Sequence, residues 1–159
     1  MAFALSTMQL TSTAFDHGGM IPQKHSGEGE NISPELHWTH VPEGTRSFAV
    51  VCHDPDAPRI EAGQYGVVHW VLYNIPATAT HMPEGVKDYT VGRTRRGEDG
   101  YFGPMPPPGH GAHHYYFMIF ALNEEMDLPP GLTLWQLLEQ IESHVTGMSR
   151  LIGAYERTE

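Results

Sequence analysis

Cysteine is nearly absent from this sequence of 159 residues, because Cys52 is its only cysteine. A disulfide within the chain is therefore impossible, and so is a zinc site built on paired cysteines. We interpret Cys52 as a small buried hydrophobic residue. A reactive thiol is the alternative, but the neighbouring sequence offers nothing that would lower the pKa of this group.

Long apolar runs are also missing. No stretch approaches the roughly 18 apolar residues that a membrane-spanning helix requires, so we expect no stable insertion into a membrane. The N-terminal residues MAFALSTMQL lack the positive start and long apolar stretch of a secretion signal. We therefore expect a cytoplasmic protein.

Positive charge is scarce. The chain has nine Lys and Arg residues and 19 Asp and Glu residues, which gives a formal net charge of −10. This charge disfavours nucleic acid and anionic membrane surfaces as partners for the molecule as a whole. The only basic cluster is Arg93, Arg95 and Arg96, which we interpret as part of a solvated loop, with an anion-binding arm as the alternative.

Proline and glycine are plentiful, with 13 and 17 residues, and they divide the chain into short segments typical of a mostly β fold. Three apolar runs predict strands, and because they are apolar on both faces we expect them to lie centrally, covered on each side. These runs are Ser47–Cys52, Val67–Ile75 and Tyr115–Leu122. Met8–Phe15 and Arg150–Tyr155 are weaker strand candidates. The length fits one domain, residues 1–159.

One helix is predicted over Thr133–Val145, where apolar residues recur at about 3.6-residue spacing. Thr133 and Gln136 have the spacing of a capping box at its start. We assign this helix a structural role.

Asp54 and Asp56 directly follow the first predicted strand and flank Pro55. In an extended chain, residues two apart point the same way, so both carboxylates are expected to enter one pocket. An equally good interpretation is turn chemistry, since Asp before Pro is common in turns. His69, near the start of the second strand, is by itself more typical of a core histidine than of a ligand-binding one.

Three further histidines, His110, His113 and His114, lie where a long loop meets the third predicted strand. On a strand, His113 and His114 face opposite ways, so at most one of them enters a given pocket. Prolines stiffen the preceding loop, and the N–H groups around Gly109 and Gly111 are candidates for binding an anion.

No known catalytic motif accompanies these residues. The sequence contains no HExxH metal motif, no GxSxG nucleophile elbow and no phosphate-binding P-loop. We expect no metal and no cofactor. A rigid pocket of Asp, His, Tyr and glycine without a nucleophile describes a binding site more readily than an active site.

Four segments together resemble the phosphatidylethanolamine-binding protein family, in its prokaryotic branch similar to Raf kinase inhibitor protein. They are SPELHWTHVPEGTRSFAVVCHDPDAP, HWVLYNIPA, GYFGPMPPPGHGAHHYYFMIFAL and LLEQIESHVTGMSRLIGAYER. The resemblance implies an antiparallel β-sandwich of one large and one small sheet, a short C-terminal helix and a ligand pocket at one end.

The resemblance also implies which residues bind the ligand. In chain order they are Asp54, Asp56, Pro58, His69, Gly103, Pro106, Pro107, Gly109, His113 and Tyr115. Family members usually carry Arg where this chain has His114, so a salt bridge behind the pocket is expected to differ.

The function expected from these observations is non-enzymatic binding of a small anionic ligand such as phosphate or phosphoethanolamine. Loop N–H groups, His69 and His113 would donate hydrogen bonds, and the two aspartates would favour the protonated imidazoles. A regulator resembling kinase or protease inhibitors, which captures a phosphorylated protein, is a second hypothesis. A hydrolase using Asp and His as acid and base is the third. A homodimer is also considered, with Trp38 or Trp135 as interface residues.

Overall fold

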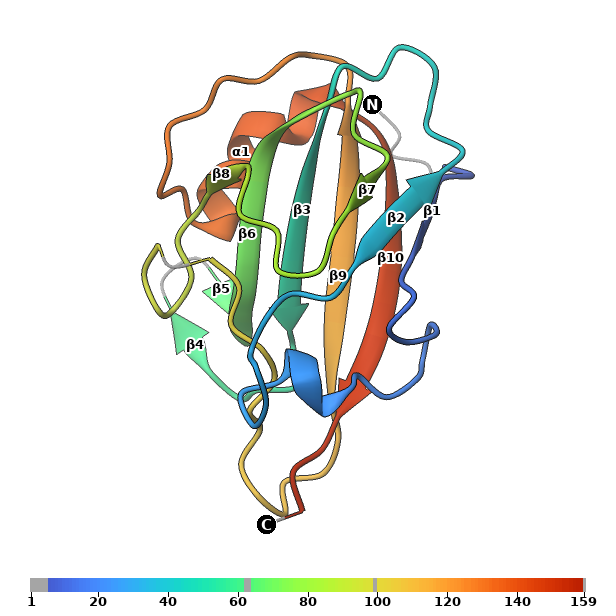
Figure 1. Cartoon of the computed structure of the whole chain (residues 1–159). Helices are drawn as coiled ribbons and strands as arrows, with labels where there is room; N and C mark the ends of the chain where they lie inside the picture. The colour runs from blue at the N-terminus through green and yellow to red at the C-terminus, as the bar shows by residue number, and fades with distance from the viewer. Residues whose placement is uncertain (1–5, 62–63, 99, 159) are drawn as a thin grey trace.

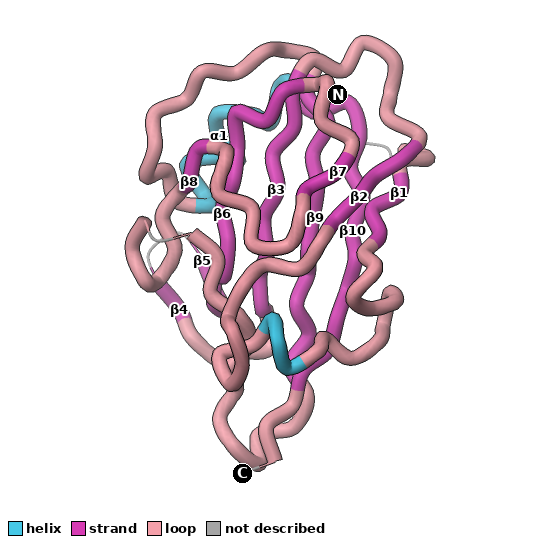
Figure 2. The backbone as a smooth tube through the Cα atoms, in the orientation of Figure 1, coloured by secondary structure: helices cyan, strands magenta, loops and turns pink. Residues whose placement is uncertain are grey.

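The structure is a computed structural model that describes residues 6–61, 64–98 and 100–158. Figures 1 and 2 show long strands at the centre, with short strands and one helix around them. The elements in chain order are β1 (Gln9–Thr11), η1 (Gln23–His25), β2 (Leu36–Thr39), β3 (Ser47–Asp54), β4 (Ile60–Glu61), β5 (Gln64–Tyr65), β6 (Val67–Pro76), β7 (His81–Met82), β8 (Thr90–Val91), β9 (His113–Leu122), α1 (Leu134–Ile141), η2 (Glu142–His144) and β10 (Val145–Tyr155).

Two antiparallel sheets form the body of the molecule. The large sheet has the strand order β10-β9-β3-β6-β8, and the small sheet has the order β1-β2-β7. The three apolar runs are the strands β3, β6 and β9, and each has a hydrogen-bonded neighbour on both sides. This confirms the mostly β architecture with one large sheet, one small sheet and a short helix near the C-terminus.

The large sheet is covered on both faces, as its apolar strands predict. One core lies between the two sheets and contains Trp38, Trp70 and Phe117. A second core lies on the other face, where Leu137 and Ile141 of α1 pack against the sheet. Figure 1 shows this layering, with the small sheet in front of the large sheet and α1 behind it. Strands buried on both faces need apolar side chains at every position, which explains the continuous runs.

The helix begins as predicted but ends earlier. Thr133 caps it, and the side chain of Thr133 accepts from the Gln136 backbone while the Gln136 side chain accepts from the Thr133 backbone. The α-helix ends at Ile141, and the next three residues form a 3-10 turn. The predicted end at Val145 is wrong because Val145 pairs with Leu122 in the sheet.

Other boundaries and one burial prediction also differ. The final strand is longer than Arg150–Tyr155, because β10 starts at Val145 and pairs along the whole of β9. The first strand covers only Gln9–Thr11. Trp38 is buried at 3% exposure and donates its indole N–H to the Ala79 carbonyl, so its proposed interface role is wrong, whereas Trp135 is 54% exposed.

Cys52 lies in the core between the sheets, and burial raises the pKa of its thiol well above the ordinary value. This confirms the interpretation of Cys52 as a buried hydrophobic residue. Among the helices of the described residues, none has the length and apolar character needed to cross a membrane.

Candidate functional site

A cavity of about 510 Å³ lies at one end of the large sheet. Three strand termini meet there, because β3 ends at Asp54 while β6 and β9 begin at Val67 and His113. In Figure 1 this is the lower end of the sheet, the end at which the chain also terminates. The antiparallel register places Asp54 opposite Val67, and His53 opposite Tyr116. Polar side chains from three distant segments of the sequence therefore meet at one end of the sheet.

The inner end of the cavity contains a buried carboxylate–imidazole pair. His113 Nδ1 lies 2.8 Å from Asp54 Oδ2, and each side chain is 4% exposed. The other carboxylate oxygen, Oδ1, accepts the backbone N–H of Asp56 at 2.8 Å. A carboxylate can only accept hydrogen bonds, so His113 Nδ1 carries the proton and the orientation of the ring is fixed.

His69 enters the same cavity through an irregularity in β6. Cys52 pairs with Trp70 and His53 pairs with Val68, so His69 is the extra residue of a β-bulge. Such a bulge re-aims one side chain and shifts the alternation by one residue, so Val68 and Trp70 face opposite cores. The His69 ring packs against Phe102 and Tyr115, with centroid distances of 4.4 and 5.1 Å.

The protonation of His69 differs from the sequence-based expectation. Burial lowers the pKa of His69 to about 4, although the bond to Phe102 and the Asp54 charge act in the opposite direction. His69 Nδ1 donates to the Phe102 carbonyl at 2.7 Å. In this structure the neutral ring therefore presents Nε2 as an acceptor, in contrast to the protonated donor expected from the sequence.

Tyr115 completes the inner end. It is 1% exposed, and burial, followed by the nearby Asp54 charge, raises the pKa of its hydroxyl. The phenol therefore stays protonated and can donate one hydrogen bond. His113 and Tyr115 are buried and His114 between them is exposed, which confirms the alternation predicted for this strand.

The cavity brings together most of the residues implied by the family resemblance. Those that line it are Asp54, Pro58, His69, Pro106, Pro107, His113 and Tyr115. The remaining three, Asp56, Gly103 and Gly109, do not line it.

Asp56 points away from the cavity because the chain turns after Asp54. Its Oδ2 accepts both the backbone N–H and the ring Nδ1–H of His114, each at 2.7 Å. Burial would raise the pKa of Asp56, but these bonds outweigh it and lower the pKa. The prediction that both carboxylates enter one pocket is therefore wrong, and His114 makes the contact behind the pocket.

Gly103 and Gly109 have structural roles here. A Cβ atom on Gly103 would lie 2.0 Å from the His25 carbonyl oxygen, so only glycine fits against this turn. The N–H of Gly103 donates to Asn31 Oδ1, and that of Gly109 donates to the Arg157 carbonyl. Neither N–H is available to an anion in this arrangement.

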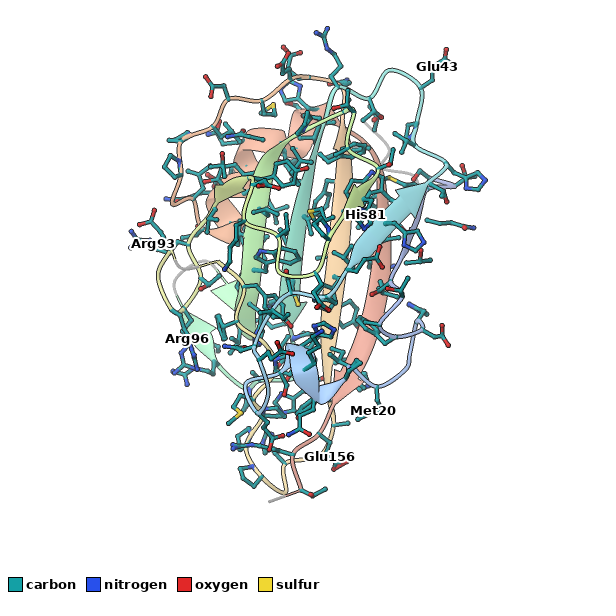
Figure 3. All side chains as sticks on the ribbon, in the orientation of Figure 1. Met20, Glu43, His81, Arg93, Arg96 and Glu156 are labelled. Carbon is teal, nitrogen blue, oxygen red and sulfur yellow. The ribbon has the colours of Figure 1, made fainter. Side chains whose placement is uncertain are left out.

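Arginine side chains at the cavity mouth are the main feature to which the sequence analysis gives too little weight, because it prefers a solvated loop to an anion-binding arm. Arg59, Arg95 and Arg96 line the cavity, and the Arg96 guanidinium lies 4.8 Å from the centroid of the Phe102 ring. The solvated-loop interpretation holds for Arg93, which does not line the cavity and pairs with Glu98 at 3.6 Å. Figure 3 shows Arg96 lower on the molecule than Arg93, close to β4 in this view.

The sequence signal for the mouth arginines is the basic cluster that contains Arg95 and Arg96. The approach of the 92–98 segment to the 54–59 segment is a tertiary contact that no local pattern reveals. None of the three arginines forms an ion pair with a residue that the structure describes.

The resulting cavity is polar at both ends. Its inner end offers two acceptors, His69 Nε2 and the Asp54 carboxylate, beside the Tyr115 hydroxyl, while its mouth offers guanidinium donors only. The walls between them are mostly apolar, with Val67, Phe102 and Met105 among the lining residues. Within the described ranges, no group of three or more His, Cys, Asp or Glu residues is arranged to hold a metal ion.

Comparisons with known proteins agree with this architecture. The family model for phosphatidylethanolamine-binding protein matches residues 11–156. A UPF0098 protein from Methanothermobacter thermautotrophicus is 41% identical over 157 residues, covering 94% of this chain and 99% of its own. A relative from Mycobacterium tuberculosis with the word lipoprotein in its name is 35% identical, covering 96% of this chain and 74% of its own.

Solved structures show the same similarity. A phosphatidylethanolamine-binding protein homolog from Chlamydia trachomatis has a TM-score of 0.86 at 36% identity, covering 94% of this chain and 97% of its own. Escherichia coli YbcL has a TM-score of 0.86 at 32% identity, covering 95% and 99%. Carboxypeptidase Y inhibitor, solved with its cognate proteinase, shares the fold at 16% identity and a TM-score of 0.58, covering 96% and 84%. The chain belongs to the phosphatidylethanolamine-binding protein family.

Proposed function

We propose that this chain is a non-enzymatic binding protein whose cavity holds a small ligand with two different ends. An anionic group, such as a phosphate, lies against the mouth arginines, and an N–H or O–H donor faces the inner end. Phosphoethanolamine has both groups. The observation that carries this proposal is one cavity with Arg59, Arg95 and Arg96 at its mouth and the acceptors of His69 and Asp54 at its inner end.

Physical chemistry supports this orientation. A guanidinium presents a planar fork of donors that matches phosphate or carboxylate oxygens, and it stays charged at every physiological pH. The Asp54 carboxylate repels a second negative charge but favours an ammonium or hydroxyl group. The apolar walls accommodate the carbon atoms that join the two ends.

A phosphorylated segment of a protein would offer the same phosphate chemistry to the mouth. A regulatory role of this kind, similar to that of kinase or protease inhibitors, is therefore part of the proposal. Carboxypeptidase Y inhibitor shares only the fold with this chain, so it supports the possibility of such a role on this scaffold and nothing more specific.

A hydrolase is the second candidate, and the Asp54–His113 pair favours it. A buried carboxylate that orients an imidazole is the usual arrangement of a general base. No Ser, Thr or Cys side chain is among the residues that line the cavity, so this chemistry would require an activated water molecule. Turnover of a phosphate or acyl ester that is lost in His113→Ala would establish it.

The cytoplasm is the proposed place of action. One relative bears the word lipoprotein in its name, so the proposal needs a direct test. Fractionation of cells that produce the full chain tests this point. Recovery of the protein in the membrane fraction would contradict it.

The experiment that tests the proposed function measures thermal stability with phosphoethanolamine, ethyl phosphate, ethanolamine, phosphotyrosine and zinc chloride. A ligand at about 100 times its Kd stabilises the folded state by about 2.7 kcal/mol, which raises Tm by several degrees. We expect phosphoethanolamine to stabilise the wild type most, because ethyl phosphate and ethanolamine each have one of the two ends and phosphotyrosine adds a bulky ring and a second anionic group.

The variant Arg96→Gln should lose most of this stabilisation, and Arg93→Gln is its matched control in the same segment. Arg93 does not line the cavity, so its variant should behave as the wild type does. Equal loss in both variants, or a shift with zinc alone, would contradict the proposed orientation.

A further inference from the structure

The Arg96 guanidinium lies over the face of the Phe102 ring, with its central carbon 4.8 Å from the ring centroid. This is within the roughly 6 Å at which a cation is attracted to the π-electrons of an aromatic ring. Arg59 and Arg95 also line the cavity mouth, but among the residues that the structure describes neither of them lies over an aromatic ring. Arg96 is therefore the mouth arginine whose charged group has an aromatic neighbour.

Phe102 is held in place by its backbone and by its packing. Its N–H donates to the His69 carbonyl at 3.2 Å, and its own carbonyl accepts the His69 Nδ1–H at 2.7 Å. Phe102 is 9% exposed, belongs to a small apolar cluster with Ala57 and Val67, and has its ring centroid 4.4 Å from that of His69. The position of the ring is thus set by contacts that do not involve Arg96.

The backbone of Arg96 is held in a tight turn. The Thr94 N–H donates to the Gly97 carbonyl at 2.8 Å, and the Gly97 N–H donates back to the Thr94 carbonyl at 3.0 Å. Gly97 has a φ of 86°, a left-handed conformation that favours glycine. The Arg96 N–H donates to the hydroxyl of buried Thr94 at 3.2 Å. The two ends of the Arg96 side chain, at the backbone and at the guanidinium, therefore both have partners although the side chain is exposed.

This order matters for binding, because an exposed arginine ordinarily samples many rotamers. A ligand that binds only one of these rotamers has its affinity reduced by the fraction of time that the side chain spends in the others. A contact that holds the guanidinium over the ring raises the fraction in the binding rotamer before the ligand arrives. The guanidinium stays charged at every physiological pH, so this contact persists across that range.

We propose that Phe102 is a positioning residue, which holds the Arg96 guanidinium in the orientation that binds the anionic group of the ligand. Phe102 acts through Arg96 and need not touch the anion. Arg96 is then ordered before the ligand binds, whereas its neighbour Arg95 becomes ordered only with it. This inference rests on the proposed function, because it concerns how the anionic end of the ligand is recognised.

Nuclear magnetic resonance relaxation of the arginine side chains tests this order in the protein without ligand. The Nε–H group of Arg96 should be more rigid than that of Arg95, and the side-chain protons of Arg96 should be shifted upfield by the ring current of Phe102. Both features should disappear in Phe102→Leu, which keeps an apolar side chain at this position. Equal mobility of the two arginines in the wild type, or persistence of the order in Phe102→Leu, would overturn the proposal.

Calorimetry on proteins with one, two or three fluorine atoms on the Phe102 ring tests the effect on binding. Each fluorine withdraws electron density from the ring face and weakens its attraction for a cation, while the shape of the ring is nearly retained. The affinity for ethyl phosphate should fall stepwise, to about threefold weaker with three fluorines, which is the value of one exposed cation–π contact. A purely structural role of the ring would instead lower Tm and leave the affinity unaltered.

A second compound separates the mouth from the inner end. Phosphoethanolamine should lose affinity by the same factor as ethyl phosphate, because the two compounds share their anionic end. A fluorine dependence with phosphoethanolamine alone would mean that the ring acts through His69, and constant affinity for both compounds would mean that it positions nothing. Either result would overturn the positioning role and leave the proposed function standing. Failure of both compounds to bind the wild type would overturn the proposed function and the positioning role together.

Discussion

The inner end of the cavity is built from strand residues, whereas its mouth is built from loop residues. Asp54 and His113 are the last and first residues of β3 and β9, and both are almost fully buried. Arg59, Arg95 and Arg96 lie on exposed segments outside the five-stranded sheet. The two regions line the same cavity, but the inner end is held by burial and strand pairing and the mouth lies on exposed loops.

Because of this difference, we expect the inner end to contribute to stability and the mouth to contribute to ligand affinity. Burial makes the inner end costly to alter, because an unpaired charge or imidazole there loses its water without gaining a partner. The mouth stays hydrated, so its arginines contribute little to folding but keep their full charge for a ligand. We therefore expect inner-end variants to lose stability and mouth variants to lose affinity.

The largest expected effect is that of Asp54→Ala on the free energy of unfolding. Removing one partner of a buried, hydrogen-bonded pair should lower this free energy by about 3 kcal/mol. Asp56→Ala is the matched comparison two residues away, and because Asp56 is exposed the loss should be about 0.5 kcal/mol. Urea denaturation of the three proteins measures both values. Similar losses of unfolding free energy in the two variants would show that burial gives Asp54 no greater effect on stability than exposed Asp56 has.

The next effect is a dependence of stability on pH that originates at His69. The pKa of this residue is about 4 in the folded protein and 6.5 ordinarily, so the unfolded chain takes up a proton first as the pH falls. Stability should therefore be unaffected by His69 above pH 6.5 and should fall by up to about 1.4 kcal/mol per pH unit toward pH 4.

The variant His69→Gln isolates this contribution, because glutamine does not titrate. Its unfolding free energy should fall less steeply between pH 6.5 and pH 4 than that of the wild type. Parallel curves for the two proteins would mean that His69 is not buried as a neutral ring.

The smallest effect is expected at the mouth. Replacing Arg59, Arg95 and Arg96 together with glutamine should lower the free energy of unfolding by about 1 kcal/mol or less, because these side chains are exposed and only Arg96 packs over an aromatic ring. Binding of phosphoethanolamine should nevertheless be lost under the same conditions. A clear loss of stability in this triple variant would show that the mouth also supports the fold.

Much of the fold is predictable from sequence because its central elements carry their own signals. The continuous apolar runs in β3, β6 and β9 require burial on both faces, and the Thr133–Gln136 pair fixes the start of α1. The two-residue strands β4, β5, β7 and β8 have no such pattern. β4 and β5 pair only with each other in a short hairpin, whereas the hydrogen bonds of β7 and β8 depend on where the chain returns to the small and the large sheet, which only the tertiary structure determines.

The site residues differ in the same way: those next to strongly predicted strands are predictable from the sequence, and those in loops are not. Asp54, His69, His113 and Tyr115 were identified because they adjoin strongly predicted strands and match a specific family pattern. Asp56 was misplaced because the parity of an extended chain does not apply once its own N–H bonds to Asp54 Oδ1 and the backbone turns. The mouth arginines were undervalued because a short basic segment has no local feature that distinguishes a solvated loop from a cavity wall.

The bulge at His69 has an evolutionary consequence. In a regular strand, exchanging a side chain changes what faces one of the two cores, so each substitution is tested by folding. His69 is the spare residue between the Trp70 and Val68 pairs, and Trp70 and Val68 supply the two opposite cores. Selection can therefore change the residue at this position without altering either core pattern, but any replacement must still fill the buried space against Phe102 and Tyr115.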